Sequence, residues 1–298
     1  MGYLFLAISL LAGATKGYCG KMTSGHVRGY KDAMLANTIR MVLCIIIGMI
    51  LILANGSLAY ITPTATVLGI SALSGITTSI FVVCWMISVQ KGAYMMLDVF
   101  LMLGVLVPLL AGNIFFNEQI RLTQWVGIVI LFVAVYIMCS YNNSIKGRMS
   151  ISSLILLIIC GVANGLTDFS QKLFVKTAGN VPIAIFNFYT YIFSAITLLG
   201  FYFVFKAKEP KSETKESPTF RKIMGYIVIM SICLFASSYF KTMAAGYLDS
   251  AILYPLNQGA ALILSSMMSA LLFHERLTVK CIIGLVISFV GLIVLNVL

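Results

Sequence analysis

Two stretches of this chain, 157 residues apart in the numbering, repeat one another. One begins at Phe116 and the other at Phe273, and each has a Glu two residues on and a Gly eleven residues on. The matching pairs are Phe116/Phe273, Glu118/Glu275, Gly127/Gly284, Val129/Val286, Ile130/Ile287, Phe132/Phe289 and Val133/Val290. Membrane chains built from two copies of one unit usually place a substrate path between the copies. The repeat therefore predicts a two-part architecture with a path at its centre.

Composition places both copies in a membrane. The chain has 298 residues, of which 60% are hydrophobic and only 10% are charged, whereas a soluble domain carries about 25% charged residues. The apolar residues come in runs of roughly 20, the length that a helix needs to cross a bilayer core. We predict an all-α polytopic membrane protein with ten transmembrane helices, at approximately 2–22, 33–55, 65–89, 93–115, 121–141, 151–174, 182–205, 222–245, 250–272 and 278–298.

The ten spans divide into two repeats of five. We expect a first five-helix repeat over 1–141, a linker over 142–150 and a second five-helix repeat over 151–298. Because five is odd, a second copy that starts where the first ends must enter from the opposite side, so the sequence predicts inverted repeats around a central cavity. The stretch 206–222 carries mixed charges and two prolines, and we expect it to be a mobile loop.

The basic residues follow the loops and do not indicate a nucleic-acid partner. The net charge is +11, but 14 of the 20 Lys and Arg residues lie at the loops that follow odd-numbered spans, which is how topology signals are distributed. That bias alone places the termini outside the cytoplasm. The first apolar run has no basic start and continues into Lys16, so we interpret it as a retained span of a multi-pass protein of the cell membrane.

Motifs for metals, cofactors and catalysis are missing from the sequence. The seven cysteines lie singly in or beside apolar runs, and neither His26 nor His274 has a partner at ligand spacing, so we expect no metal or other cofactor. No GxxxxGK[ST], HExxH or GxSxG motif occurs. An intramembrane aspartic dyad of Asp98 and Asp168 is disfavoured because neither Asp has a glycine beside it. We therefore predict that the chain is not an enzyme and that ATP does not drive it directly.

The repeated turn resembles that of a known family. Glu-Arg-Leu-Thr at Glu275, with Gly284 nine residues after the Glu, resembles the EamA family of the drug/metabolite transporter superfamily, and Glu118 with Gly127 repeats the pattern. Lys21, Lys172 and Arg40 also resemble basic residues of the family, whereas its Trp-Gly in the first span appears here as Gly13-Ala14 and Asn164-Gly165. The resemblance implies ten helices around a central cavity, with rocking-type alternating access. The family usually keeps both termini inside the cytoplasm, against the charge bias. Its members handle amino acids, cations, sugars and other metabolites.

Five ionisable residues lie within predicted spans, where each costs roughly 2.5–3.5 kcal/mol on insertion scales. They are Lys16, Arg40, Asp98, Asp168 and Lys241. Aligning the repeats sets Lys16 and Asp168 at similar depths of the first and sixth spans. We hypothesise that these two approach each other in the cavity or bind opposite ends of one substrate. The alternative is a permanent ion pair that fixes helix packing.

Asp98 is a candidate for a substrate ammonium or a coupling proton, or else a satisfied partner of Arg40 or Lys241. The repeat sets it against Pro255, within Tyr254-Pro255-Leu256-Asn257-Gln258, which we expect to be a break in the helix that lines the cavity. Aromatic residues near these charges in the sequence can hold a cation or a flat metabolite, although any one of them can equally be packing. The predicted substrate-binding residues are Lys16, Arg40, Trp85, Tyr94, Asp98, Asp168, Tyr189, Lys241, Tyr254 and Asn257.

Other repeated residues have structural interpretations. Glu118 and Glu275 are expected to bond the backbone in the first turn of the helix that follows each. Gly127, Gly284 and Gly291 are expected to permit close helix contact. The pairs Gly13/Gly17 and Gly161/Gly165 have small-xxx-small spacing, which suits either tight packing or a sliding contact.

These features favour a secondary transporter of a small polar or amphiphilic organic solute, by alternating access and by proton coupling or exchange. The mixed charges favour an amino-acid-like, zwitterionic or anionic metabolite. The alternatives are a flippase for a lipid-linked carrier and a non-transporting membrane subunit. The expected partners are the small-molecule substrate and the lipid bilayer, with a possible coupling proton and no nucleic acid, for a monomer or homodimer.

Overall fold

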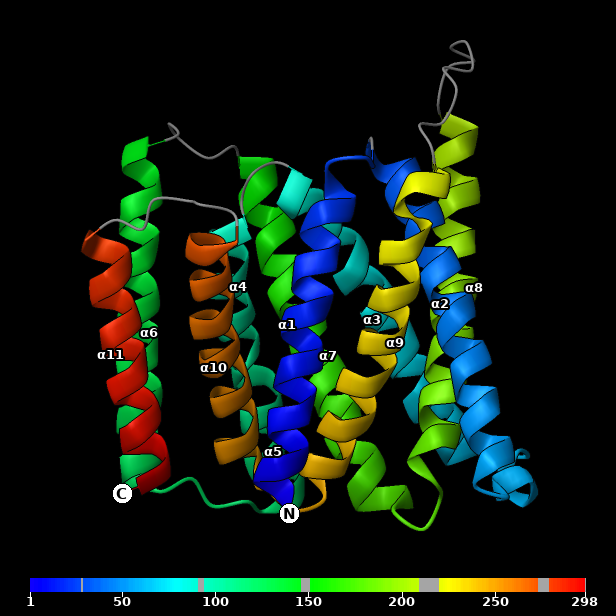
Figure 1. Ribbon diagram of the computed structural model, residues 1–298. Coiled ribbons are helices and arrows are strands. Elements are labelled where there is room, and N and C mark those ends of the chain that lie inside the picture. Colours follow the sequence, from blue (N-terminus) through cyan, green and yellow to red (C-terminus); the bar gives the residue numbers. More distant parts are fainter. Residues whose placement is uncertain (28, 91–93, 146–150, 209–219, 273–278, 298) are drawn as a thin grey trace.

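The computed structural model describes residues 1–27, 29–90, 94–145, 151–208, 220–272 and 279–297. Within them the chain forms a helical bundle, with a short 3-10 turn, η1, at Ser57–Tyr60 (Figure 1). The helices are α1 (Gly2–Ser24), α2 (Gly29–Ala54), α3 (Ala65–Gln90), α4 (Tyr94–Gly104), α5 (Leu106–Phe116), α6 (Leu122–Ile145), α7 (Ile151–Ala178), α8 (Ile183–Lys208), α9 (Phe220–Ala245), α10 (Ser250–Leu271) and α11 (Val279–Val297).

Each predicted span corresponds to a helix, except that the fourth contains two. Only Val105 separates α4 from α5. Pro108 explains the break, because a proline has no N–H to donate to the carbonyl four residues earlier, here that of Gly104. The expected break at Pro255 was wrong, since α10 runs continuously from Ser250 to Leu271 with Pro255 inside it.

The two halves of the chain begin at opposite ends of the bundle. In Figure 1, α1 starts at the end where both termini lie, whereas α7 starts at the other end. Helices of the first half pack mainly on helices of the second: α1 on α9, α3 on α7, α2 on α8 and α6 on α11. The α1–α9 and α3–α7 contacts are equivalent to each other, because in both the first helix of one half packs on the third helix of the other half.

Glycines allow the closest of these approaches. A Cβ added at Gly161 would collide with the carbonyl oxygen of Phe100, and one added at Gly165 would collide with that of Gly104. The pair Gly161/Gly165 therefore lets the backbones of α4 and α7 approach each other closely, as small-xxx-small spacing permits. Gly291 plays the same part between α11 and α6, where its Cβ would lie 3.2 Å from the carbonyl oxygen of Gly127.

The outer surface of the bundle is apolar. Among the described residues, five helical segments are long and apolar enough to cross a membrane: Tyr30–Ala54, Ala65–Val89, Ser152–Ala178, Ile183–Val204 and Ile223–Ala245. Large exposed side chains cover several of the outer faces, among them Ile46, Ile50, Val129, Val133, Ile155, Ile159, Val286 and Val290. So much exposed apolar surface is unfavourable in water but suits contact with lipid. The chain is thus a polytopic helical membrane protein.

Candidate functional site

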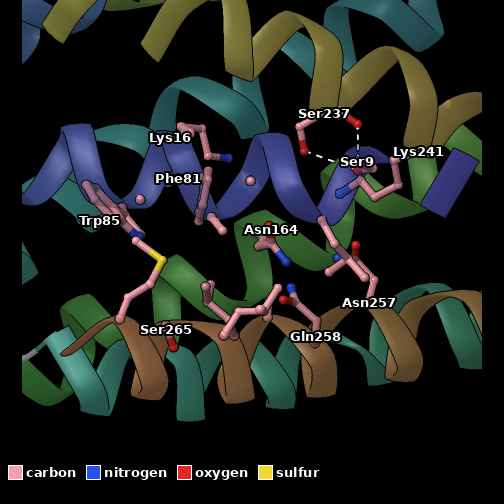
Figure 2. A pocket seen from close by; sticks show the side chains of 18 residues that line it. Ser9, Lys16, Phe81, Trp85, Asn164, Ser237, Lys241, Asn257, Gln258 and Ser265 are labelled. Atoms are coloured by element: carbon pink, nitrogen blue, oxygen red, sulfur yellow. Dashed lines mark hydrogen bonds between the residues drawn. The ribbon is translucent and has the colours of Figure 1, made fainter. Parts of the chain in front are cut away.

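A cavity of about 120 Å³ lies where the two halves meet (Figure 2). Its wall comes from α1, α3 and α4 of the first half and from α7, α9 and α10 of the second. The lining residues are Ser9, Leu10, Gly13, Ala14, Lys16, Gly17, Phe81, Trp85, Leu101, Asn164, Ser237, Lys241, Asn257, Gln258, Ala261, Leu264, Ser265 and Met268. Four of the predicted substrate-binding residues therefore line one cavity: Lys16, Trp85, Lys241 and Asn257.

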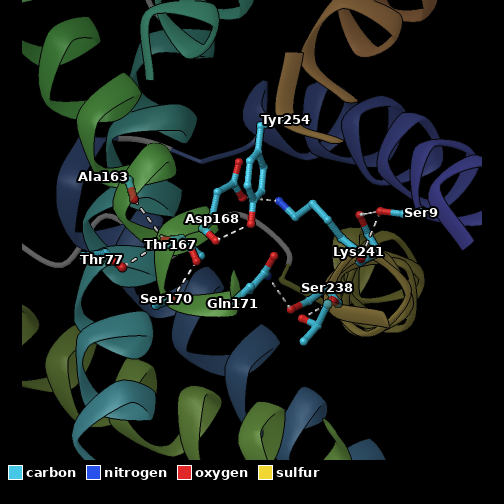
Figure 3. Close-up of polar contacts among 12 residues, drawn as sticks. Ser9, Thr77, Ala163, Thr167, Asp168, Ser170, Gln171, Ser238, Lys241 and Tyr254 are labelled. Carbon is cyan, nitrogen blue, oxygen red and sulfur yellow. Dashed lines mark hydrogen bonds and ion pairs between the residues drawn. The ribbon is translucent and has the colours of Figure 1, made fainter. Parts of the chain in front are cut away.

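An ion pair at one end of the cavity joins Lys241 of α9 to Asp168 of α7 (Figure 3). The Asp168 side chain is 1% exposed and that of Lys241 is 13% exposed. Tyr254, which is fully buried, donates its hydroxyl hydrogen to the backbone carbonyl oxygen of Asp168 at 2.8 Å. Lys241 faces the cavity, whereas Asp168 and Tyr254 are not part of its lining. Together these residues fix α7, α9 and α10 behind one end of the cavity.

Lys16 interacts electrostatically with Asp168, as the expected approach implies, but it is not the residue that forms the ion pair with Asp168. Lys241 makes the ion pair, because α9 rather than α1 carries the ammonium group that reaches Asp168. Among the described residues, Lys16 makes no hydrogen bond or ion pair of its own, and it projects toward the cavity from α1 (Figure 2).

Arg40 and Lys16 border a second, smaller space of about 20 Å³ beside the main cavity. The two spaces share Lys16, Phe81 and Trp85. Arg40 is 4% exposed, and its Nε has no hydrogen-bond partner among the described residues. No described carboxylate lines either space. Lys16 and Arg40 are thus two neighbouring cations that form no ion pair with a carboxylate in the described part of the chain.

Polar uncharged side chains complete the site, and of these only Asn257 is among the predicted substrate-binding residues. Asn164 of α7 lies four residues before Asp168, and Gln258 follows Asn257 on α10. Residues four apart share a helix face, so the position of Asn164 relative to Asp168 was a usable signal. Ser9 donates to the backbone carbonyl oxygen of Ser237 at 2.9 Å, which links α1 to α9 at the cavity wall.

Of the other three predicted residues, the structure places only the side chain of Tyr189, and it lies away from the cavity. Tyr189 donates its hydroxyl hydrogen to the carbonyl oxygen of Ile61 at 2.7 Å and lines neither space. That bond ties α8 to the segment after η1. Tyr94 and Asp98 belong to α4, and their side chains lie outside the described part of the structure.

A buried ionic cluster around Glu118 joins three parts of the chain next to the Asp168 turn. Glu118 lies between α5 and α6, and its Oε1 is 2.8 Å from the Nζ of Lys172. Its Oε2 accepts a hydrogen bond from the backbone N–H of Ser250, the first residue of α10, at 2.8 Å. The Lys172 ammonium also donates to the carbonyl oxygens of Ala245 and Leu248.

Glu118 therefore bonds a helix N-terminus as expected, but that of α10 rather than the α6 that follows it. Burial by itself raises the pKa of this carboxyl group, but the hydrogen bonds from Lys172 and Ser250 outweigh it and lower the pKa below its ordinary value. Glu275, the corresponding residue of the second half, lies outside the described residues.

Comparison with known proteins adds the family. Residues 151–297 match the model of the EamA-like transporter family. A crystal structure of a protein that is 14% identical to this chain superposes with a TM-score of 0.74, over 99% of this chain and 96% of the other. An identity this low establishes a shared fold and no more. None of the curated proteins matches the sequence.

Proposed function

Since this chain belongs to the EamA-like transporter family, whose model its second half matches, we propose that it carries a small polar or amphiphilic organic metabolite across the membrane by alternating access. The family consists of membrane transporters of the drug/metabolite type, so the chain is a multi-pass membrane transporter. The proposal adds a substrate class, zwitterionic or anionic, a place for the substrate and a mode of movement.

The observation that carries the proposal is the cavity between the halves. It has cationic, amide and aromatic side chains, which are Lys16, Lys241, Asn164, Asn257 and Trp85 among others. Ligand sites combine an apolar wall with a few polar groups that fix orientation. A carrier of polar solutes needs such groups at membrane depth, where they would otherwise be costly.

Alternating access requires two units that move against each other around the site. We assign these units to residues 1–141 and 151–298, as inverted repeats. Three features support the assignment: the opposite starts of α1 and α7, the paired contacts α1–α9 and α3–α7, and the cavity at their junction. Rocking of such repeats exposes one central site to each side in turn.

One end of the cavity is held by buried polar bonds. The Lys241–Asp168 pair and the Glu118–Lys172 pair lie one turn apart along α7, and both reach the corner between α9 and α10. In our proposal the state described here is closed at this end, and the Glu118–Lys172 contact separates when the transporter opens there.

Counterflow tests the proposal. A panel of amino acids and organic acids is first screened by thermal shift on the purified protein, because a ligand stabilises the state that binds it. Each stabilising solute is then loaded into proteoliposomes, and uptake of the labelled form from a dilute outside solution is followed. We expect a transient accumulation above the level of protein-free liposomes. Ligands that stabilise the protein yet show no counterflow would identify a receptor or subunit instead of a transporter.

A further inference from the structure

We propose that the end of the cavity at Trp85 is a subsite for an oxyanion, so that the ligand is an organic carboxylate or phosphate monoester with a compact apolar body, bound by Lys16 and Arg40. The inference rests on the proposed function and narrows its substrate class from zwitterions and anions to anions.

The charge balance of the site supports an anion. Lys16 and Arg40 border the smaller space together, and no described carboxylate forms an ion pair with either, although Asp168 interacts electrostatically with Lys16 from a longer distance. Arg40 is buried, with 4% of the residue exposed, and its Nε lacks an acceptor in the described part of the chain. Buried cations are normally paired, because an unpaired charge loses its hydration without compensation. A bound oxyanion supplies the missing partner to both.

The geometry of the two spaces supports a charged head and an apolar body. The smaller space, about 20 Å³, has room on the scale of one water molecule, which needs about 10–15 Å³. Because it shares Lys16, Phe81 and Trp85 with the main cavity, a ligand can place its oxygen atoms beside the two cations and its body against the aromatic rings. Guanidinium groups bind carboxylate and phosphate oxygens with well-matched geometry.

The opposite end of the cavity does not suit an ammonium group. In Figure 2, Lys241 and Asn257 lie at the side away from Trp85 and Lys16. The nearest described carboxylate there is that of Asp168, which is already paired with Lys241 and does not line the cavity. The amides of Asn164, Asn257 and Gln258 can accept or donate hydrogen bonds to a neutral polar substituent. An amino acid would have to place its ammonium group beside Lys241, without a described counterion.

Ligands matched in shape and different in charge test the inference. The thermal stability of the purified full chain is measured with benzoate and phenyl phosphate, with the neutral benzamide, with the cation benzylamine and with the zwitterion phenylalanine. We expect saturable stabilisation by at least one of the two oxyanions and a smaller or no shift with the other three. The two oxyanion arms distinguish a carboxylate site from a phosphate-ester site. Stabilisation by phenylalanine equal to or greater than that by the oxyanions would overturn the inference, and so would no oxyanion shift above that of benzamide.

Variants connect the binding to the two cations. Lys16→Met is expected to raise the half-saturating concentration of the oxyanion at least tenfold, whereas Lys16→Arg retains most of the affinity. Lys21→Met removes the same charge from the same helix without touching either space and serves as the matched control. Arg40→Lys keeps the charge if Arg40→Met fails to fold. Equal weakening by Lys21→Met and Lys16→Met would show a general charge effect and refute the subsite.

Failure of the inference can be told apart from failure of the proposed function. If a zwitterion or cation stabilises the protein and shows counterflow, the chain is a transporter and the anion subsite is wrong. If the oxyanion binds through Lys16 but no counterflow occurs, the subsite stands and the transport proposal is wrong.

Discussion

Replacement of Glu118 tests how much the buried ionic cluster stabilises this fold. The carboxylate contacts Lys172 and the N–H of Ser250, each at 2.8 Å, and the side chains of Glu118 and Lys172 are 6% and 2% exposed. Removing one partner of a buried ion pair costs about 3–5 kcal/mol, since the other charge stays buried. Lys172 keeps two backbone carbonyl acceptors, those of Ala245 and Leu248. We therefore expect Glu118→Ala to lower the free energy of unfolding by about 3 kcal/mol, at the low end of that range.

Two further variants separate the contributions. Glu118→Gln keeps an acceptor in place and loses only the charge, so we expect a loss of about 1–2 kcal/mol. Lys176→Met removes a second cation, whose Nζ lies 3.5 Å from the Oε1 of Glu118. The Lys176 side chain is 42% exposed. Exposed pairs contribute about 0–1 kcal/mol, and this variant is the control for charge removal near the site. Unfolding free energies come from reversible denaturation in mixed micelles. A Glu118→Ala protein within about 0.5 kcal/mol of the wild type would refute the reasoning, because the cost assigned to an unpaired buried charge would be absent.

The pH dependence gives an independent check on the same group. A carboxyl group whose pKa is lowered in the folded state stabilises that state above its ordinary pKa, here 4.5, and the stabilisation is lost as the pH falls below that value through the folded pKa. The stability difference between wild type and Glu118→Gln should therefore shrink on acidification below about pH 4.5 and stay constant above it. A difference that grows on acidification would contradict the lowered pKa.

Two other expectations follow from the packing and from the Asp168 ion pair. Gly161→Ala should destabilise the protein by about 1–3 kcal/mol, because the new methyl group collides with the carbonyl oxygen of Phe100. Gly69→Ala is the control, because nothing lies within 4 Å of its added Cβ, and it should leave the melting temperature nearly unchanged. Equal changes in melting temperature for the two variants would count against tight α4–α7 packing. Lys241→Met should be more destabilising than Asp168→Asn, because it leaves a carboxylate that is 1% exposed without its cation, whereas the asparagine variant leaves a lysine that borders the cavity. The reverse order in melting temperature would show that the cavity does not accommodate the freed ammonium group.

Local signals in the sequence were sufficient to place most of the spans, but not the helix break within the fourth. Runs of apolar residues and turn-forming residues act over a few neighbours, so the span predicted at 65–89 became α3 at Ala65–Gln90 and the span at 151–174 became α7 at Ile151–Ala178. Whether a proline breaks its helix was harder to predict at the two positions Pro108 and Pro255. Pro255 lies within a continuous α10, and the break falls near Pro108, because surrounding helices decide whether a freed carbonyl group is tolerated.

The residues of the candidate site could be predicted from the sequence only in part. Scarce charges in apolar spans pointed to Lys16 and Lys241, which do line the cavity. Tyr189 has an equally suggestive sequence context, yet its hydroxyl group is used by the backbone of Ile61. The partner of an aromatic hydroxyl group depends on which loop lies beside it, and spacing along one helix carries no such information.

By itself, the sequence determined that the chain spans a membrane many times, approximately where most of its spans lie, and that it repeats. The apolar runs were enough because the bilayer imposes the same length on every span. Only the tertiary structure decided that Asp168 pairs with Lys241 and not with Lys16, and that Glu118 binds Lys172 and the start of α10. Which helices pack together in a membrane depends on close packing of small residues and on polar contacts. Apolar faces do not discriminate between partners, because contact with lipid is about as favourable for them as contact with another apolar helix. Partnerships between distant charges therefore exist only once the bundle has assembled.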